Sequence, residues 1–146
     1  MDYITVREMG ATSDVLSPRV FKNLILPPLQ KVMKEISVHS VLHICGKTND
    51  IVPFMMEANP TAISVEQKND VAESRKKLGN DALIFGNMDA YNVLVSGDEE
   101  LVRKTVRKCI DDGVSAVWPG CDIWPTVPPQ NMNAMMDEVR NYGGKK

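Results

Sequence analysis

Two short segments carry the most distinctive chemistry of this chain of 146 residues. The first is His43-Ile44-Cys45-Gly46 and the second is Pro119-Gly120-Cys121-Asp122. In a strand the side chains at positions i and i+2 lie on the same face, so His43 and Cys45 can point at one atom. Cys121, at the end of another strand, would complete a His/Cys/Cys set. Zinc takes such a set when a fourth position stays open for chemistry, and two thiolates favour activating a thiol over activating water.

Five strand-like segments alternate with helix-like segments along the chain. They are short, rich in Val, Ile and Leu, and apolar on both faces, which is typical of buried parallel strands. These segments are Tyr3–Glu8, Ser40–Cys45, Ala62–Glu66, Ala82–Phe85 and Val114–Trp118. Five consecutive β-α units predict a parallel sheet with right-handed crossovers. A whole (β/α)8 barrel needs about 250 residues, which leaves two architectures open: a doubly wound sheet, or a partial (β/α)8 TIM barrel.

Capping residues mark the predicted helices. Ser17 followed by Pro18 predicts a helix start, and Pro27-Pro28 should divide the segment after it into two shorter helices. The other helices are expected from Asn69 or Asp70 to Leu78, from Asp98 to Gly113 and from about Pro129 to Tyr142. Cys109 falls on the buried stripe of the second of these, so we interpret it as a core residue.

The composition limits the class of protein. A hydrophobic fraction of 43% supports a sizeable core, and the length fits one domain over residues 1–146. A net charge of −2 argues against a nucleic-acid partner. No apolar run reaches the roughly 18 residues of a membrane span, and no signal peptide is recognisable. Three cysteines without the spacing of a disulfide framework favour a reducing cytoplasm.

Metal-compatible side chains gather at one predicted edge of the sheet. In parallel α/β folds, ligands and catalytic groups lie beyond the carboxyl ends of the strands. The residues at or just past predicted strand ends are His43, Cys45, Glu66, Asn87 and Cys121. We interpret the histidine and the two cysteines as zinc ligands. Glu66 is either an exposed carboxylate or a fourth, exchangeable ligand that leaves when substrate binds, and the sequence leaves both readings open.

Several stretches of the chain resemble the methylcobalamin:coenzyme M methyltransferases of the uroporphyrinogen decarboxylase superfamily. These stretches are Ile4 to Ala11, His43 to Gly46, Ile63 to Glu66, Phe85 to Asn87 and Pro119 to Cys121. The resemblance covers nearly the whole chain and implies the carboxyl-terminal part of a (β/α)8 barrel, roughly its last five β-α units. It also implies that His43, Cys45 and Cys121 bind zinc and that Glu66 completes the tetrahedron as a catalytic ligand when no thiol is bound. Glu8 and Asn87 are expected near the substrate and cofactor cavity.

The resemblance implies a function. A methyl group would move from methylcobalamin, carried by a corrinoid protein, to the thiol of coenzyme M or a similar small thiol, with zinc activating that thiol. A catalytically inactive truncated paralogue that binds zinc or a corrinoid protein is the second reading, and a uroporphyrinogen decarboxylase-like activity is a weaker third. The amino-terminal barrel portion is absent from this chain, so we expect a homo-oligomer or a complementing chain to cover the open sheet edges.

Overall fold

The computed structural model describes residues 2–144, in which five strands alternate with helices. The strands are β1 (Tyr3–Glu8), β2 (His39–Ile44), β3 (Ala62–Val65), β4 (Ile84–Met88) and β5 (Ala116–Pro119). The α-helices are α1 (Pro18–Val20), α2 (Leu26–Lys34), α3 (Val52–Glu57), α4 (Val71–Leu78), α5 (Glu99–Asp111) and α6 (Pro129–Glu138), and the π-helical segments are η1 (Phe21–Ile25) and η2 (Val139–Gly143). Within this described range no helix is long and apolar enough to cross a membrane.

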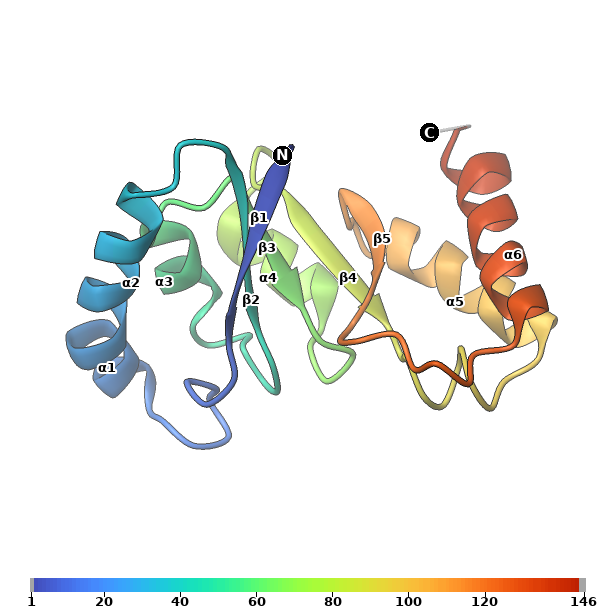
Figure 1. Ribbon diagram of the computed structural model, residues 1–146, viewed down its shortest axis with the longest axis horizontal. Helices are drawn as coiled ribbons and strands as arrows, with labels where there is room; N and C mark the ends of the chain where they lie inside the picture. The colour runs from blue at the N-terminus through green and yellow to red at the C-terminus, as the bar shows by residue number, and fades with distance from the viewer. Residues whose placement is uncertain (1, 145–146) are drawn as a thin grey trace.

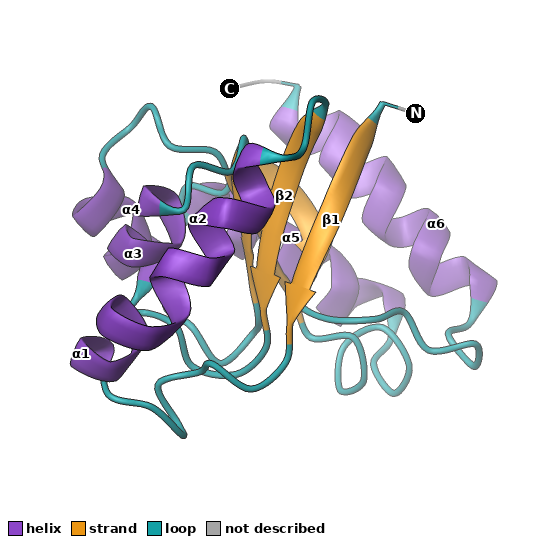
Figure 2. Ribbon diagram, turned by 60° about the vertical axis from the view of Figure 1, so that its left-hand side comes forward, coloured by secondary structure: helices purple, strands orange, loops and turns teal. Residues whose placement is uncertain are grey.

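The sheet has the topology of a barrel segment. All five strands are parallel, and their order in the sheet, β1-β2-β3-β4-β5, follows their order in the chain. A doubly wound sheet would reverse its strand order at a switch point and carry helices on both faces. Here helices α2 to α5 follow one face of the sheet (Figure 1 and Figure 2). The architecture is therefore a partial (β/α)8 barrel, and the doubly wound alternative is wrong.

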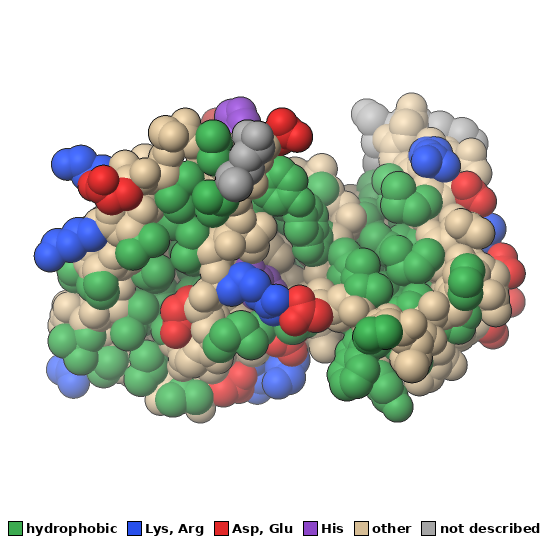
Figure 3. All heavy atoms as spheres, in the orientation of Figure 1, with side chains coloured by type: hydrophobic (Ala, Val, Ile, Leu, Met, Phe, Trp, Pro, Cys, Tyr) green, Lys and Arg blue, Asp and Glu red, His purple; other side chains and the backbone are tan. Residues whose placement is uncertain are grey.

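The opposite face of the sheet is concave, and side chains from its two edge strands meet across it. The ring of Tyr3 on β1 contacts the ring of Trp118 on β5 edge to face, with centroids 6.3 Å apart. Phe85 on β4 stacks on Trp118 with centroids 5.4 Å apart. Figure 3 shows hydrophobic side chains on this face and a hollow between the two ends of the molecule. The curvature is strong enough to bring strands from opposite edges within side-chain reach.

Apolar side chains between the sheet and the helices form two clusters. The first includes Phe21, Leu42 and Ile63 and joins β2 and β3 to helices α2 and α3. The second includes Met88 and Cys109 and joins β4 to helices α5 and α6. Cys109 is 2% exposed, which confirms its interpretation as a core residue. The helix-facing side of the sheet is thus well buried, and the concave side is left for chemistry.

The predicted helix starts are confirmed, but one predicted break is not. Three N-cap side chains each accept a hydrogen bond from the backbone amide three residues further along the chain: Ser17, Asp70 and Asp98. At Pro27-Pro28 the helical run changes type and continues, with η1 leading directly into α2. The prolines donate no amide hydrogen bond to the preceding turn, and the run passes them where it changes from the π-helical segment η1 to the α-helix α2. The expected division into two separate helices is therefore wrong.

Strand β4 begins two residues later than the sequence predicts, at Ile84 instead of Ala82. The guanidinium of Arg75 on α4 donates to the carbonyl of Ala82 at 2.6 Å and holds this segment as a loop. Leu83 is 41% exposed, although its apolar character resembles that of a buried strand. The shift has a consequence for the site, because Asn87 lies inside the strand and not beyond its end.

Candidate metal centre

Three side chains from two strand ends meet at the carboxyl edge of the sheet. His43 lies on β2, Cys45 directly follows that strand, and Cys121 follows β5. Their donor atoms, one imidazole nitrogen and two thiol sulfurs, lie within 4.8 Å of one another. His43 Nε2 is 3.2 Å from Cys45 Sγ, and the two sulfurs are 3.7 Å apart. The structure thus brings together the three residues interpreted from the sequence as metal ligands.

These separations fit the bond lengths of a tetrahedral zinc ion. With Zn–S bonds of about 2.3 Å and a Zn–N bond of about 2.0–2.1 Å, two sulfur ligands lie about 3.8 Å apart and a nitrogen and a sulfur about 3.6 Å apart. The sulfur–sulfur distance of 3.7 Å and the nitrogen–sulfur distance of 3.2 Å are close to these values. The donor set and its spacing therefore suit zinc with one position open.

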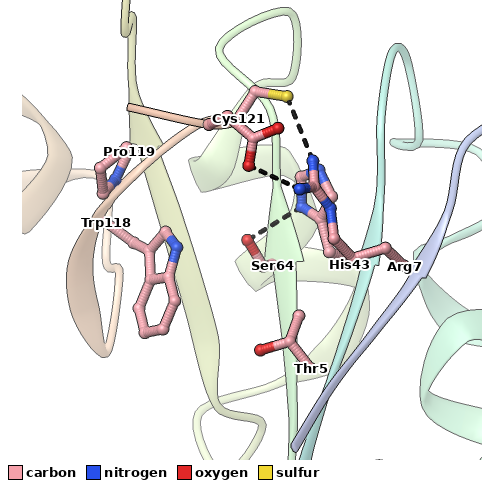
Figure 4. A pocket seen from close by; sticks show the side chains of 8 residues that line it. Thr5, Arg7, His43, Ser64, Trp118, Pro119 and Cys121 are labelled. Atoms are coloured by element: carbon pink, nitrogen blue, oxygen red, sulfur yellow. Dashed lines mark hydrogen bonds and ion pairs between the residues drawn. The ribbon is translucent and has the colours of Figure 1, made fainter. Parts of the chain in front are cut away.

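The imidazole of His43 is held in the form that a metal ligand needs. Its ring is 4% exposed, and Nδ1 lies 3.1 Å from the hydroxyl of Ser64 on β3 (Figure 4). Burial, with a smaller contribution from the charge of Arg7, lowers the pKa of His43 below its ordinary value. Such a partner on the second ring nitrogen fixes the tautomer of a metal-binding histidine. The neutral ring therefore presents Nε2 to the two cysteines.

A guanidinium lies beside the two sulfurs. Arg7 Nη2 is 3.6 Å from Cys121 Sγ, and Arg7 Nη1 is 2.5 Å from Asp122 Oδ1. The hydrogen bond with Asp122 raises the pKa of Arg7 further above its usual value. Burial and the hydrogen bond with Cys121 raise the pKa of the Cys45 thiol to about 11. Metal binding must therefore displace a proton from this thiol, which makes the affinity depend on pH.

Each sulfur has a glycine as its chain neighbour, and both glycines are required by close contacts. Gly46 has φ +82°, and a Cβ there would lie 2.5 Å from Thr12 Oγ1. A Cβ on Gly120 would lie 2.8 Å from the backbone nitrogen of Gln67. A side chain at either position would move the loop that carries a cysteine. The two glycines thus fix the positions of the two sulfurs.

A cavity of about 200 Å³ opens on the concave face next to the cluster. His43 and Cys121 form one side of it, and Asp122 lies beside them. The residues that line the rest are Thr5, Arg7, Ser64, Trp118 and Pro119. Figure 4 shows Arg7, His43 and Cys121 pointing toward one another, with Trp118 across the cavity. A small ligand in this space would contact a metal ion and a positive charge at the same time.

Glu66 lies next to the cluster and outside it. Its carboxylate is 8% exposed and accepts the backbone amide of Gly46, the residue after Cys45. Its other oxygen is 3.9 Å from Lys68 Nζ. Among the described residues, the group with donor atoms within 4.8 Å of one another contains the histidine and the two cysteines alone. Glu66 is therefore a neighbour of the centre in this conformation.

Glu8 and Asn87 contact backbone groups beside the two neighbouring strands. The carboxylate of Glu8 accepts the amide of Gly10 at 3.0 Å and so holds the turn after β1. The side-chain amide of Asn87 donates to the carbonyl of Asn69 at 2.8 Å, and its oxygen lies 3.6 Å from Cys109 Sγ. Neither residue lines the cavity within the described part of the chain. The structure does not bring these two residues to the cluster.

Arg7 and Ser64 belong to the site and escaped the sequence analysis. Arg7 pairs in register with His43, and His43 pairs with Ser64, so the three form one row across β1, β2 and β3. Side chains at paired positions of parallel strands point to the same face. An arginine near the carboxyl end of a predicted strand was a usable signal, but the register that places it beside His43 depends on the folded sheet.

Comparisons with known proteins identify relatives of this chain. The family model for uroporphyrinogen decarboxylase (URO-D) matches residues 2–142. "Methylcobamide:CoM methyltransferase MtaA" of Methanosarcina barkeri is 32% identical over 142 residues, which cover 97% of this chain and 42% of that protein. "Methylated-thiol--coenzyme M methyltransferase" of Methanosarcina mazei is 29% identical over 125 residues, covering 86% of this chain and 34% of the relative.

A solved structure agrees with the sequence relatives. A methyltransferase from Methanosarcina mazei superposes with a TM-score of 0.90 and 26% identity, over 97% of this chain and 42% of that protein. The chain therefore spans well under half the length of these relatives. The family match extends from the start of β1 to the last described helical segment. On this evidence the chain belongs to the uroporphyrinogen decarboxylase (URO-D) family.

Proposed function

We propose that this chain is the zinc-binding portion of a methyltransferase that moves a methyl group from a methylated corrinoid to the thiol of coenzyme M. The observation that carries the proposal is the meeting of His43, Cys45 and Cys121 beside a small cavity. The names of two relatives support the substrates, since both are called coenzyme M methyltransferases and one is named for a methylcobamide.

The chemistry of the three ligands suits this reaction. His43, Cys45 and Cys121 would hold the zinc ion, which would lower the pKa of a thiol bound at the open position, so that the thiol proton leaves to water and the sulfur stays nucleophilic. His43 contributes a neutral lone pair because burial lowers its pKa, and Ser64 keeps the ring in position. In the transfer, a sulfur–carbon bond forms as the cobalt–carbon bond breaks, and the electron pair stays on cobalt. The cavity walls hold the thiol in line, and such alignment can contribute roughly 7–11 kcal/mol.

The other predicted site residues take supporting roles in the proposal. Glu66 is the exchangeable fourth ligand. This role is supported by its burial and by the hydrogen bond that its carboxylate accepts from the amide of Gly46, the residue after Cys45. Carboxylate oxygen is an accepted zinc ligand. Glu8 and Asn87 keep their proposed place near the substrate and cofactor cavity of the completed barrel, and their support is the loops that they hold through contacts with Gly10 and Asn69.

Full activity is proposed for an assembly that completes the barrel. The chain spans 42% of the length of a curated relative, and strands β1 and β5 form the two edges of the sheet. We propose that further strands, from the same polypeptide, another copy or a complementing chain, pair with these edges. Coenzyme M and a corrinoid protein are the proposed partners. Thiolate ligands need reduced cysteines, so the proposed location is the cytoplasm.

Two other functions compete with this one. A catalytically inactive module that binds zinc or a corrinoid protein is favoured by the limited coverage of the relatives. A decarboxylase-like activity is favoured only by the family name, and it gives no role to the two sulfurs. Thioether formation from methylcobalamin and coenzyme M separates the methyltransferase from both, because zinc-dependent turnover above background excludes an inactive module.

The first test of the proposal is metal content. We expect the purified chain, reconstituted under reducing conditions, to bind one zinc ion, and Cys121→Ala to bind less than a tenth of that. Cys109→Ala is the matched control, since that thiol is buried on α5 and bonded to Asn87. Wild-type protein that regains no zinc on reconstitution would refute the proposal, and a Cys121→Ala variant with full zinc would refute the ligand assignment.

A further inference from the structure

We infer that Arg7 is the residue that selects the thiol substrate, by binding an anionic group at the far end of a short thiol whose sulfur occupies the zinc site. The inference rests on the proposed function and adds the residue that distinguishes charged from neutral thiols. The preferred substrates are small thiols that carry an oxyanion, such as a sulfonate or a carboxylate. Neutral thiols of the same length bind more weakly.

The position of Arg7 supports this role. Arg7 and His43 are paired residues on β1 and β2, so both side chains project from the concave face. Arg7 Nη2 lies 3.6 Å from Cys121 Sγ, which sets the guanidinium beside the metal-binding sulfurs. A thiol whose sulfur joins those ligands and whose anion is two carbons away would reach the guanidinium.

The cavity has the size and charge for such a ligand. Its volume of about 200 Å³ is smaller than the range of roughly 300–1,000 Å³ found for drug-sized ligands. Among the described residues that line it, Arg7 is the one Lys or Arg. The planar guanidinium donates two parallel hydrogen bonds to an oxyanion, which a lysine does not do. The hydroxyls of Thr5 and Ser64 add polar groups to the same wall.

Asp122 forms an ion pair with the guanidinium of Arg7. Its Oδ1 is 2.5 Å from Arg7 Nη1, while its side chain is 74% exposed and that of Arg7 is 35% exposed. Exposed ion pairs of this kind contribute little stability, because both charges remain hydrated. A substrate oxyanion can therefore displace the carboxylate, which returns to water at low cost. Asp122 then competes with the anionic group of the substrate.

A purely structural role for Arg7 predicts different behaviour. If the guanidinium only neutralised the two sulfurs or held the loop of Cys121, its loss would weaken zinc binding and would affect charged and neutral thiols equally. Substrate selection instead predicts a loss confined to anionic thiols. The ratio of two thiol affinities, measured on zinc-loaded protein, separates the two roles.

The experiment compares coenzyme M (2-mercaptoethanesulfonate), 3-mercaptopropionate and neutral 2-mercaptoethanol by titration calorimetry on the zinc-loaded chain. We expect the wild type to prefer the two anionic thiols by about ten- to a hundredfold, the usual value of a hydrogen bond to a charged group. Arg7→Gln should abolish this preference and Arg7→Lys should keep part of it. Arg140→Gln is the matched control, because Arg140 forms an exposed ion pair with Asp137 at 3.7 Å, away from the cavity.

Asp122→Asn provides an independent readout that leaves Arg7 in place. It should raise the affinity for the anionic thiols several-fold and leave that for 2-mercaptoethanol unchanged. Zinc-loaded wild type that binds the three thiols equally overturns the inference and leaves the proposed function standing. An Arg7→Gln variant that holds zinc and keeps the full preference also overturns it. A wild-type chain that binds no zinc overturns the proposed function itself.

Discussion

Ser64→Ala removes the hydroxyl that lies 3.1 Å from His43 Nδ1 and changes no metal-binding atom. The hydroxyl keeps the imidazole oriented so that Nε2 faces the sulfur of Cys45 at 3.2 Å. Without it, the ring can rotate or change tautomer, and a buried nitrogen loses its partner. Zinc affinity should therefore fall although all three ligands are present.

The size of the effect follows from the burial of the pair. Loss of a hydrogen-bonding partner behind a metal-binding histidine typically costs about 10–100-fold in metal affinity, which is about 1.4–2.7 kcal/mol. His43 is 4% exposed and Ser64 is 2% exposed, so water has little access to replace the lost hydroxyl. We therefore expect a value in the upper half of that range, about 30–100-fold.

A competition titration against a chromophoric chelator measures this change. Ser74→Ala is the matched control, because Ser74 is equally buried on α4 and its hydroxyl donates to the carbonyl of Asp70 at 3.0 Å. Each variant loses one buried hydroxyl, but only the hydroxyl of Ser64 faces the candidate metal centre. Equal zinc affinity in wild type, Ser64→Ala and Ser74→Ala would show that the orientation of His43 does not control the site.

Three further changes test other parts of the structure. Gly46→Ala would set a Cβ 2.5 Å from Thr12 Oγ1 at φ +82°. The free energy of unfolding in urea should therefore fall by about 1–3 kcal/mol, and zinc should bind more weakly. An unchanged urea midpoint would contradict the clash. Leu94→Ala empties a fully buried position of the second cluster and should cost about 2–5 kcal/mol in the same assay without changing zinc stoichiometry. The hydrogen bond with Arg107 holds the pKa of Glu138 below its ordinary 4.5, so the stability from this carboxylate is complete above that value and is lost as the pH falls through the lowered pKa. The loss of stability caused by Glu138→Gln should therefore be full at pH 7 and become smaller as the pH falls below 4.5, and a loss that does not change with pH would refute the assignment.

The fold and the meeting of the three candidate metal ligands could be predicted from the sequence because they depend on local periodicity. The period of two residues in a strand sets His43 and Cys45 on one face. The ends of parallel strands meet at one edge of a sheet, which brings Cys121 to the same place. The strict alternation of strands and helices indicated the β-α units, and the observed strand order removed the doubly wound alternative.

Other features of the site depend on contacts between distant segments. Arg7 reaches the centre through strand register, which no single strand reveals. Asn87 was expected just past a strand end. A hydrogen bond from Arg75 keeps Ala82 in a loop, so strand β4 starts later and contains Asn87. The helical run through Pro27-Pro28 continues with a change from the π-helical segment η1 to α2. For Arg7 and Asn87, contacts between distant segments decided what the local sequence left undetermined.

The two cysteines of the centre are 76 positions apart and lie at the ends of β2 and β5, with β3 and β4 between these strands. A metal ion held by both would act as a reversible cross-link that closes a long loop. In the chain-entropy treatment, a covalent link over such a span stabilises a protein by on the order of 4 kcal/mol. It would also connect strand β2, which contributes to the first hydrophobic cluster, with strand β5, which packs against the second. The melting temperature would then rise with the concentration of free zinc.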